Sequence, residues 1–408
     1  MAAPASDPAT LDRRKVLAAT ASALLLTACG RGEAEDDEPA RGVTTAGGKD
    51  LVLGVSLELT GAGAALGVLQ ERALRISLES LNADGVPVGN LRRSIRLEIR
   101  DNASDPRLAA QQATELIRRG GVHALLGGTL TETSAAIVEV AQQLQTPYVS
   151  LAHGDGIVLP LAQRTYIYKL TPDAADVARR LARLIASQGL ERVTLLAASG
   201  LHGNSGVRTM SAALRTVGLK PGAVVRLPDA AESFFPAAQR VVAAKPDAVV
   251  IWGTAPDTGA AAQALRQSGH SGPLYLDSGG IAEETLDGRN AAALEGAYAV
   301  HPICLGGSTL TNTTMAALAR RDFVYRYIQR HGGFSGFAPY ASDALQLIAN
   351  AARQASSVDR GRLRAYLQTQ VIEGIAGAYS FAPIRHGGMD RNSLGVYRVD
   401  HGGWVRVS

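Results

Sequence analysis

Residues Ala124–Leu151, with the sequence ALLGGTLTETSAAIVEVAQQLQTPYVSL, contain one complete unit of alternating strand and helix. The apolar run Ala124–Leu126 predicts a buried strand, and Gly127 and Gly128 allow the backbone to turn sharply after it. Apolar residues then recur at the i, i+3, i+4, i+7 spacing of one helical face, and a second short strand follows Pro147. The stretch therefore predicts a strand, a glycine turn, a helix and a strand, in that order.

The start of this helix is rich in hydroxyl groups, which come from Thr129, Thr131, Thr133 and Ser134. Free backbone N–H groups at a helix N-terminus, with hydroxyls beside them, suit an anion such as a carboxylate. The same residue types are also common helix caps, whose side chain accepts a hydrogen bond from a backbone N–H group. Thr131 or Thr133 is therefore expected to cap the helix, to bind an anion, or to do both.

The composition is that of a globular protein large enough for two or more domains. The chain has 408 residues, of which 46% are hydrophobic and 19% are charged. A net charge of +4 and an aromatic content of 5% give no signal for nucleic-acid binding. Two cysteines, Cys29 and Cys304, cannot form a disulfide framework, and the eight histidines show no metal-ligand spacing. We therefore expect no metal, no cofactor and no nucleic-acid partner.

Three glycines, Gly61, Gly63 and Gly67, follow a predicted strand and precede a predicted helix, as in a dinucleotide-binding turn. The third glycine is one position late, however, and no acidic residue ends a second strand about 20 residues further on. The sequence also contains no phosphate-binding loop, no nucleophile turn and no convergent set of acid, base and nucleophile. We therefore interpret the glycines as a loop and predict no catalytic residues.

The first fifty residues have the composition of an export signal and a tether. Arg13–Lys15 precede an apolar segment, Val16–Ala28, that is too short to span a membrane. This segment leads into Leu26-Thr27-Ala28-Cys29, which resembles the bacterial lipobox, where the cysteine is lipidated. Residues 1–29 are therefore predicted to be a signal peptide with a lipobox, and the paired arginines leave a twin-arginine signal open. Residues 30–50 are acidic and nearly free of apolar residues, so we expect a disordered tether outside the cytoplasm.

After residue 50 the chain alternates strand and helix in two successive runs. The first run reaches about Leu170, and the second extends from about Val177 to Leu276. Such alternation predicts parallel sheets that are covered by helices on both faces. The last third is more helical, with predicted helices at Met315–His331 and Ala338–Ala355. The fold class is therefore α/β, with two such domains.

Seven short motifs occur in a fixed order along the folded chain. They are Thr60-Gly61, Asn82–Gly85, Asp101–Pro106, Leu126–Gly128, Pro147–Ser150, Pro246–Ala248 and Tyr340–Leu345. In their order and spacing they resemble the leucine/isoleucine/valine-type periplasmic binding proteins, the type I solute-binding components of ABC transporters. The resemblance covers about residues 51–400, and many such receptors are lipoproteins.

The resemblance implies two doubly wound lobes joined by three crossovers. Lobe 1 would contain residues 51–171 and 302–384, and lobe 2 would contain residues 172–301 and 385–408. It also implies that a small solute binds in the cleft between the lobes, which hinge shut around it and present it to an ABC permease. The implied location is extracytoplasmic, with a lipid anchor on Cys29 in the cell envelope.

The resemblance also implies a set of ligand-binding residues. These are Thr131, Ala152, His153, Gly154, His202, Trp252, Thr254, Asp277 and Ser278. In the family, the position of Thr131 holds the ligand carboxylate, and Ser278 falls where an acid pairs with the ligand ammonium. Thr254 and Leu66 stand where the family has aromatic residues. An amino acid is therefore expected only if Asp277 supplies the acid; otherwise an organic acid, an aromatic acid or an amide is expected.

Each of these residues also has a purely structural interpretation. His153 and His202 could be solvated loop histidines, Trp252 could belong to the core, and Thr254 could cap the helix after Pro256. The function has an alternative as well, namely a sensor or a cell-envelope interaction lipoprotein on the same fold. Tight binding of a small solute would distinguish the transport receptor from this alternative.

Overall fold

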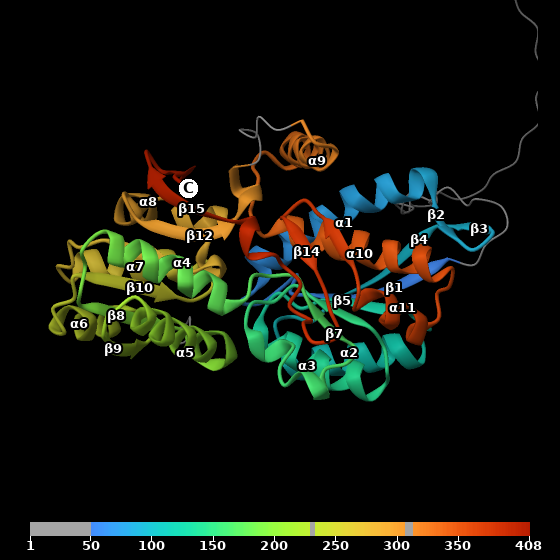
Figure 1. Ribbon diagram of the computed structural model, residues 1–408, viewed down its shortest axis with the longest axis horizontal. Coiled ribbons are helices and arrows are strands. Elements are labelled where there is room, and N and C mark those ends of the chain that lie inside the picture. Colours follow the sequence, from blue (N-terminus) through green and yellow to red (C-terminus); the bar gives the residue numbers. More distant parts are fainter. Residues whose placement is uncertain (1–49, 229–232, 307–312) are drawn as a thin grey trace, which may run out of the picture. The chain divides into compact units, whose positions relative to one another are not determined.

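The computed structural model describes residues 50–228, 233–306 and 313–408, which contain two large β-sheets with helices on both faces and two two-stranded sheets (Figure 1). The first sheet has the order β4-β1-β5-β6-β7, and all its strands are parallel. Helices α1 and α10 cover one face, and α2 and α3 cover the other. The bounds are β1 Leu51–Leu57, α1 Ala64–Asp84, β4 Ile95–Asp101, α2 Pro106–Arg118, β5 Ala124–Gly127, α3 Thr131–Gln143, β6 Tyr148–Ser150, β7 Ile167–Lys169 and α10 Ala338–Ala355.

The second sheet has the order β16-β15-β12-β11-β10-β8-β9, with β15 and β16 antiparallel to their neighbours. Helices α4 and α5 pack together on one face, and α6, α7 and α8 pack together on the other. The bounds are α4 Ala174–Ser187, β8 Val193–Ala197, α5 Gly200–Thr216, β9 Pro221–Arg226, α6 Phe235–Ala243, β10 Ala248–Trp252, α7 Asp257–Gln267, β11 Leu274–Leu276, α8 Arg289–Leu294, β12 Tyr298–Pro302, β15 Leu394–Asp400 and β16 Gly403–Arg406.

The parallel strands of the two sheets are wound in the same way. Counted along the chain, the five parallel strands of each sheet lie in the order 2-1-3-4-5. In such a sheet the winding direction reverses between strands 1 and 3, and the loops at the carboxyl ends of these strands form a crevice. The reversal falls between β1 and β5 in the first sheet and between β8 and β10 in the second.

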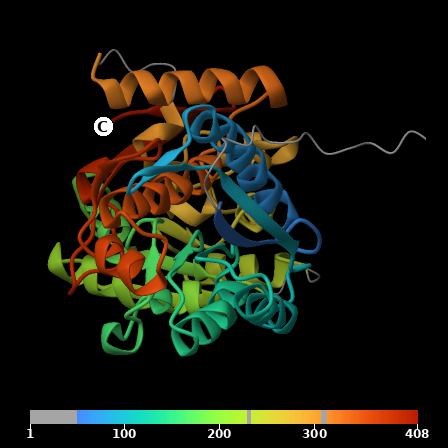
Figure 2. The same cartoon turned by 90° about the vertical axis from the view of Figure 1, so that its right-hand side faces the viewer.

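The chain crosses between the two sheets three times within the described residues. It enters α4 after β7, returns after β12 to α9 (Met315–His331), which lies beside α1 (Figure 2), and enters β15 after the hairpin of β13 (Val371–Glu373) and β14 (Ala378–Ser380). The first and third crossings are hydrogen-bonded to each other. Lys169 N donates to His386 O at 2.9 Å, and Gly388 N donates to Lys169 O at 3.1 Å.

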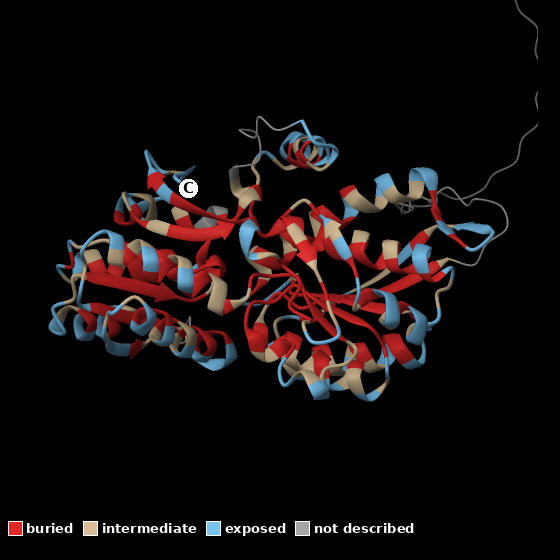
Figure 3. Ribbon diagram, in the orientation of Figure 1, coloured by how far each residue is buried: buried red, intermediate tan, exposed pale blue. Residues whose placement is uncertain are grey.

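The apolar core continues from one sheet to the other. A single cluster of buried side chains includes Leu53 of β1, Tyr168 of β7, Leu195 of β8 and Val250 of β10. Figure 3 shows the central strands buried along their length and the helices exposed on one side only. This pattern is expected for parallel sheets that are covered on both faces.

The predicted α/β class is confirmed, and the predicted bounds of α9 and α10 agree with the structure. The predicted loop before α1 is wrong in one respect, because the helix begins at Ala64, inside the glycine-rich segment. A Cβ at Gly67 would collide with the carbonyl oxygen of Glu58 at the end of β1. The glycine spacing therefore reflects close packing of α1 on the chain that leaves β1. The α-helices and strands that the sequence pattern did not predict are β2 (Val86–Val88), β3 (Leu91–Arg93), α8, β12 and β13.

The predicted signal peptide, Cys29 and the predicted tether up to Lys49 lie outside the described residues. Within the described ranges, no helix combines the length and apolar character needed to cross a membrane. The same ranges contain no group of three or more histidine, cysteine, aspartate or glutamate residues that could hold a metal ion. Cys304 is a free, buried thiol, and burial raises its pKa to about 12.

Candidate functional site

Six rings from both sheets meet at the carboxyl ends of the strands. We call them the ring cluster: Trp252, His202, His153, Phe337, Tyr340 and His301. The ring centroids of His153 and His202 are 5.7 Å apart, and those of His202 and Trp252 are 6.1 Å apart. His153 also lies 5.3 Å from Phe337 and 6.0 Å from Tyr340, whose ring is 6.5 Å from His301. The rings therefore form one continuous group.

The winding of the sheets explains why these residues meet. Trp252 ends β10 and His202 lies in the first turn of α5, so both belong to the reversal point between β8 and β10. His153 lies in the loop after β6 of the first sheet. These three side chains are buried, with exposed fractions of 1% for Trp252, 5% for His202 and 4% for His153. The interpretation of the two histidines as solvated loop residues is therefore wrong.

Polar atoms of the ring cluster are buried without a hydrogen-bond partner among the described residues. They are His153 Nε2, His202 Nδ1, Trp252 Nε1, His301 Nε2 and Tyr340 Oη. A buried polar group without a partner costs about 1–3 kcal/mol, so such atoms rarely gather in one place without reason. A bound polar molecule would supply the missing partners, which makes the ring cluster the candidate binding site.

Thr131 is the first residue of α3 and contacts the loop that carries His153. Its Oγ1 donates a hydrogen bond of 2.7 Å to the backbone oxygen of His153. The residue before the helix is Leu130, and no side chain caps the helix, so the predicted capping by Thr131 or Thr133 is wrong. Thr131 instead holds the His153 loop against the start of α3.

A carboxylate does bind at the start of α3, but it belongs to the protein. Glu58, which follows β1 and is fully buried, accepts hydrogen bonds from Thr129 N at 2.8 Å and Leu130 N at 3.3 Å. Thr133 Oγ1 also donates to Glu58 Oε1. The anion-binding groups that the sequence predicted here are therefore partly occupied by Glu58.

Asp277 is fully buried beside the ring cluster, and its carboxylate is engaged within the protein. Oδ1 accepts a hydrogen bond from Gly253 N at 3.0 Å, and Oδ2 accepts one from Gly279 N at 2.9 Å. His202 Nε2 lies 3.0 Å from Oδ2, at ion-pair distance but without hydrogen-bond alignment. Two amides and the His202 imidazole therefore surround the charge of Asp277.

Three other predicted site residues lie beside His153 or beside Asp277. Ala152 and Gly154 are buried on either side of His153, and a Cβ at Gly154 would lie 3.2 Å from Thr131 Cγ2. Ser278 is buried next to Asp277. The structure thus brings Thr131 and residues 152–154 of the first sheet to the same region as the predicted residues of the second sheet.

From the sequence, Thr254 could cap a helix and Trp252 could belong to the core, and the structure tests both interpretations. Thr254 is half-buried, and α7 begins after Pro256 without a side-chain cap, so the predicted capping role of Thr254 is wrong. Trp252 is part of the core and also part of the ring cluster. Gly206 of α5 lies against its ring so closely that a Cβ would collide with it.

Four residues near the candidate site were missed from the sequence: Glu58, His301, Phe337 and Tyr340. Tyr340 opens one of the seven motifs, and that motif was the available signal for it. Phe337 and Tyr340 stand at the start of α10, almost 200 residues beyond His153, which they contact. No local pattern indicates such a contact, because it depends on the return of the chain to the first sheet.

The histidines of the ring cluster make stability depend on pH. Burial lowers the pKa of His153 well below its usual value, and the nearby charges of His202, Lys169 and His301 add to the effect. Burial also lowers the pKa of His301 from 6.5 to about 4. The stability that neutral His301 contributes is present above pH 6.5 and is lost as the pH falls toward 4.

We expect His301→Gln to reduce the loss of stability between pH 7 and pH 5 by about 2 kcal/mol, because the unfolded chain no longer gains a proton at this residue. Urea unfolding at pH 7 and at pH 5 gives the change in the free energy of unfolding between these pH values for each protein. His401→Gln, at an exposed residue, is the control and should leave the difference unchanged. An equal pH dependence in the wild type and His301→Gln would contradict the assignment.

Comparison with known proteins was made on the sequence and on the fold. An extracellular ligand-binding receptor from Rhodopseudomonas palustris HaA2 superposes with a TM-score of 0.78 at 24% identity, over 88% of this chain and 100% of the other. A leucine-binding protein from Thermotoga maritima superposes with a TM-score of 0.74 at 19% identity, over 88% of this chain and 98% of the other. A solute-binding protein of an ABC transporter from R. palustris BisB5, solved in complex with 3,4-dihydroxybenzoic acid, has a TM-score of 0.76 at 20% identity, over 88% and 96%. No match was found among curated proteins.

Two equally wound parallel sheets with a polar site at their carboxyl ends define the type I periplasmic binding fold. The model of the periplasmic binding protein family matches residues 51–403, and the chain belongs to this family, as its seven sequence motifs predicted. The members are extracytoplasmic solute-binding proteins and not enzymes.

Proposed function

We propose that this protein is the receptor of an ABC transporter and captures a small carboxylate-bearing solute at the ring cluster. The main support is the buried group of unpartnered polar atoms on residues from both sheets, from His153 to Trp252. A solute that bonds to both sides is held only when the two sides are together, so binding favours the closed state. The closed receptor would then present the solute to the ABC permease.

The two sides correspond to two lobes. Lobe 1 comprises residues 51–171 and 302–384, and lobe 2 comprises residues 172–301 and 385–408. The three crossings of the chain between the sheets support this division, because each falls near a proposed boundary. Closure is a rotation of one lobe against the other at these crossings.

The proposed binding residues lie on both lobes. They are Thr131, Ala152, His153, Gly154, His202, Trp252, Thr254, Asp277 and Ser278, to which we add Tyr340 and His301 of the ring cluster. Trp252 can only donate through Nε1, whereas Tyr340 and the neutral imidazoles of His153 and His301 can donate or accept. A solute with several oxygen acceptors and an apolar body matches this combination of donors and rings.

The class of solute depends on whether the Asp277 carboxylate can pair with an ammonium group of the ligand. This carboxylate already accepts two amide hydrogen bonds and lies beside His202. This engagement favours an organic or aromatic acid without an ammonium group. Among structures with the same fold, one holds 3,4-dihydroxybenzoic acid and another, from Streptococcus pneumoniae, holds isoleucine. Both classes of solute therefore belong in the test.

A thermal-shift screen of amino acids, hydroxybenzoates, dicarboxylates and amides tests the proposal, followed by calorimetry on each hit. Micromolar affinity corresponds to roughly −8 kcal/mol and raises the melting temperature clearly at saturation. If no solute shifts the melting temperature, the alternative function of a sensor or interaction lipoprotein is favoured instead.

We expect Tyr340→Phe to weaken solute binding by about 10- to 100-fold, since it removes one hydrogen-bonding hydroxyl from the site. The same change should leave the free energy of unfolding unchanged or slightly raised, because the hydroxyl has no partner in the part of the chain that the structure describes. Tyr168→Phe is the control, because the Tyr168 hydroxyl is bonded to Arg364 O at 2.9 Å, outside the ring cluster. Unchanged affinity in Tyr340→Phe would remove the ring cluster from the proposed site.

The proposed location is the outer face of a membrane, where lipid on Cys29 anchors the protein beside its permease. The lipobox-like residues Leu26–Cys29 support this assignment. Several acyl chains give stable anchoring, since each buried CH₂ contributes about 0.8 kcal/mol. Labelling with a fatty acid tests the anchor, and Cys29→Ser should abolish both the label and the recovery of the protein with membranes.

A further inference from the structure

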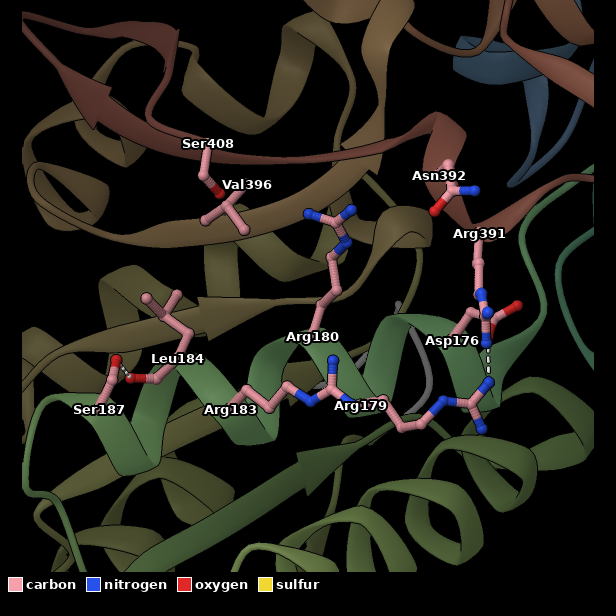
Figure 4. A pocket seen from close by; sticks show the side chains of 10 residues that line it. All are labelled: Asp176, Arg179, Arg180, Arg183, Leu184, Ser187, Arg391, Asn392, Val396 and Ser408. Atoms are coloured by element: carbon pink, nitrogen blue, oxygen red, sulfur yellow. Dashed lines mark hydrogen bonds and ion pairs between the residues drawn. The ribbon is translucent and has the colours of Figure 1, made fainter.

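A basic hollow of about 710 Å³ lies along α4 and shares no residue with the ring cluster (Figure 4). Arg179, Arg180 and Arg183 line it from α4, and Arg391 lines it from the 3₁₀ helix η6 (Arg391–Ser393), just before β15. Among the side chains that line the hollow, one carries a carboxylate, that of Asp176. The hollow is therefore strongly positive.

The arginines face the hollow because the opposite side of α4 is fixed in the core. Arg180 and Arg183 are three residues apart and so lie on one face of the helix. Leu181 and Ile185 are fully buried on the other face. The apolar contacts of α4 thus set the direction of its basic face, and Figure 4 shows the Arg180 side chain between α4 and the strand that carries Val396.

The positive charge in the hollow is largely uncompensated. Asp176 pairs with Arg179. The side chains of Arg180, Arg183 and Arg391 form no hydrogen bond or ion pair with any residue in the described ranges. Arg180 is half-buried, and burial, together with the charges of Arg406 and Arg183, lowers its pKa, although the charge of Asp176 acts in the opposite direction. An anion bound here would relieve the repulsion between these guanidinium groups.

We propose that this hollow is a second binding site, which takes a phosphate-bearing anion through Arg180, Arg183 and Arg391. Guanidinium groups bind phosphate oxygens through pairs of parallel hydrogen bonds, a geometry that favours arginine over lysine. Asn392, which also lines the hollow, adds an uncharged donor. The phosphate belongs either to a soluble compound or to the headgroup of an anionic lipid.

The test uses the full chain with Cys29→Ser, so that no lipid anchor contributes to membrane binding. Inorganic pyrophosphate is titrated by calorimetry at low and high salt, and vesicles of phosphatidylcholine with and without phosphatidylglycerol are used for co-sedimentation. Arg180→Gln with Arg183→Gln is the site variant. Arg118→Gln with Arg119→Gln, at two exposed residues at the end of α2, is the matched control.

We expect saturable pyrophosphate binding that weakens at high salt and falls by at least about tenfold in the site variant but not in the control. Co-sedimentation that requires phosphatidylglycerol and is lost only in the site variant would identify the lipid headgroup as the source. Pyrophosphate binding without co-sedimentation would identify a soluble phosphate compound. Absence of both kinds of binding, or an equal loss in both double variants, would overturn the proposal.

Discussion

Lys169→Met should lower the free energy of unfolding by about 3–5 kcal/mol, because it removes a fully buried cation from among two carboxylates and two carbonyl oxygens. Lys169 ends β7 and is fully buried. Its Nζ donates to Thr171 O at 2.7 Å and to Pro172 O at 3.0 Å. It also lies 3.1 Å from Asp173 Oδ1 and 3.8 Å from Asp155 Oδ1. The substitution removes all four interactions at the first crossing of the chain.

Urea unfolding at pH 7 and at two salt concentrations measures this effect. Lys220→Met, at an exposed lysine, is the control and should change the free energy of unfolding by no more than about 0.5 kcal/mol. The loss in Lys169→Met should persist at high salt, because a buried pair is poorly screened. A second change, Asp173→Asn, should restore part of the lost free energy of unfolding, since it removes one of the two carboxylates that Lys169 faces. A loss below about 1 kcal/mol would show that Lys169 is not part of a buried charge network.

Glu58→Ala is the second substitution with a large expected effect, a loss of about 3 kcal/mol in the free energy of unfolding. It removes the acceptor of Thr129 N, Leu130 N and the Thr133 hydroxyl, all at the start of α3. Water cannot replace it easily, because Thr129 and Thr133 are buried. Two backbone N–H groups would then lack a partner, whereas the Thr133 hydroxyl keeps its hydrogen bond of 3.0 Å to Leu130 O.

Glu58→Gln separates hydrogen bonding from the loss of the side chain. Gln keeps one acceptor oxygen, and its amide can donate to the Thr133 hydroxyl, so we expect about half the loss of Glu58→Ala. Glu115→Ala, at an exposed residue of α2, is the control. Equal losses in the two Glu58 variants would mean that the contribution comes from packing and not from the carboxylate.

The α/β fold could be predicted from the sequence because its units are local. The stretch Ala124–Leu151 contains its strands, turn and helix within 28 residues, and similar units repeat along the chain. The motifs also placed Thr131, His153, His202 and Trp252 in one region, although they are far apart in the sequence. Where the prediction failed, as at the start of α1, a close backbone contact decided the conformation, and one sequence cannot reveal such a contact.

The contacts and hydrogen-bond partners of the candidate site were harder to predict from the sequence than the fold. The sequence suggested free N–H groups at the start of α3. Glu58, which lies more than 70 positions earlier in the chain, accepts hydrogen bonds from two N–H groups of the turn before this helix. The sequence also gave no sign that Phe337 and Tyr340 reach His153. Contacts of this kind follow from the order in which strands join a sheet and from the return of α10 to the first sheet, so they require the three-dimensional structure.

The hydrogen bonds between Lys169 and the segment His386–Gly388 have a mechanical consequence. The crossing after β7 and the crossing before β15 are thus paired into one ribbon and are not independent linkers between the two large sheets. His386 stacks on Tyr168 with a centroid distance of 4.7 Å, which stiffens the ribbon further. If one sheet with its helices slid past the other, these contacts would break, whereas bending or twisting of the ribbon keeps them. For the proposed closure, this pairing restricts the relative movement of the two lobes to few directions, so that less orientational entropy would be lost when they close around a solute.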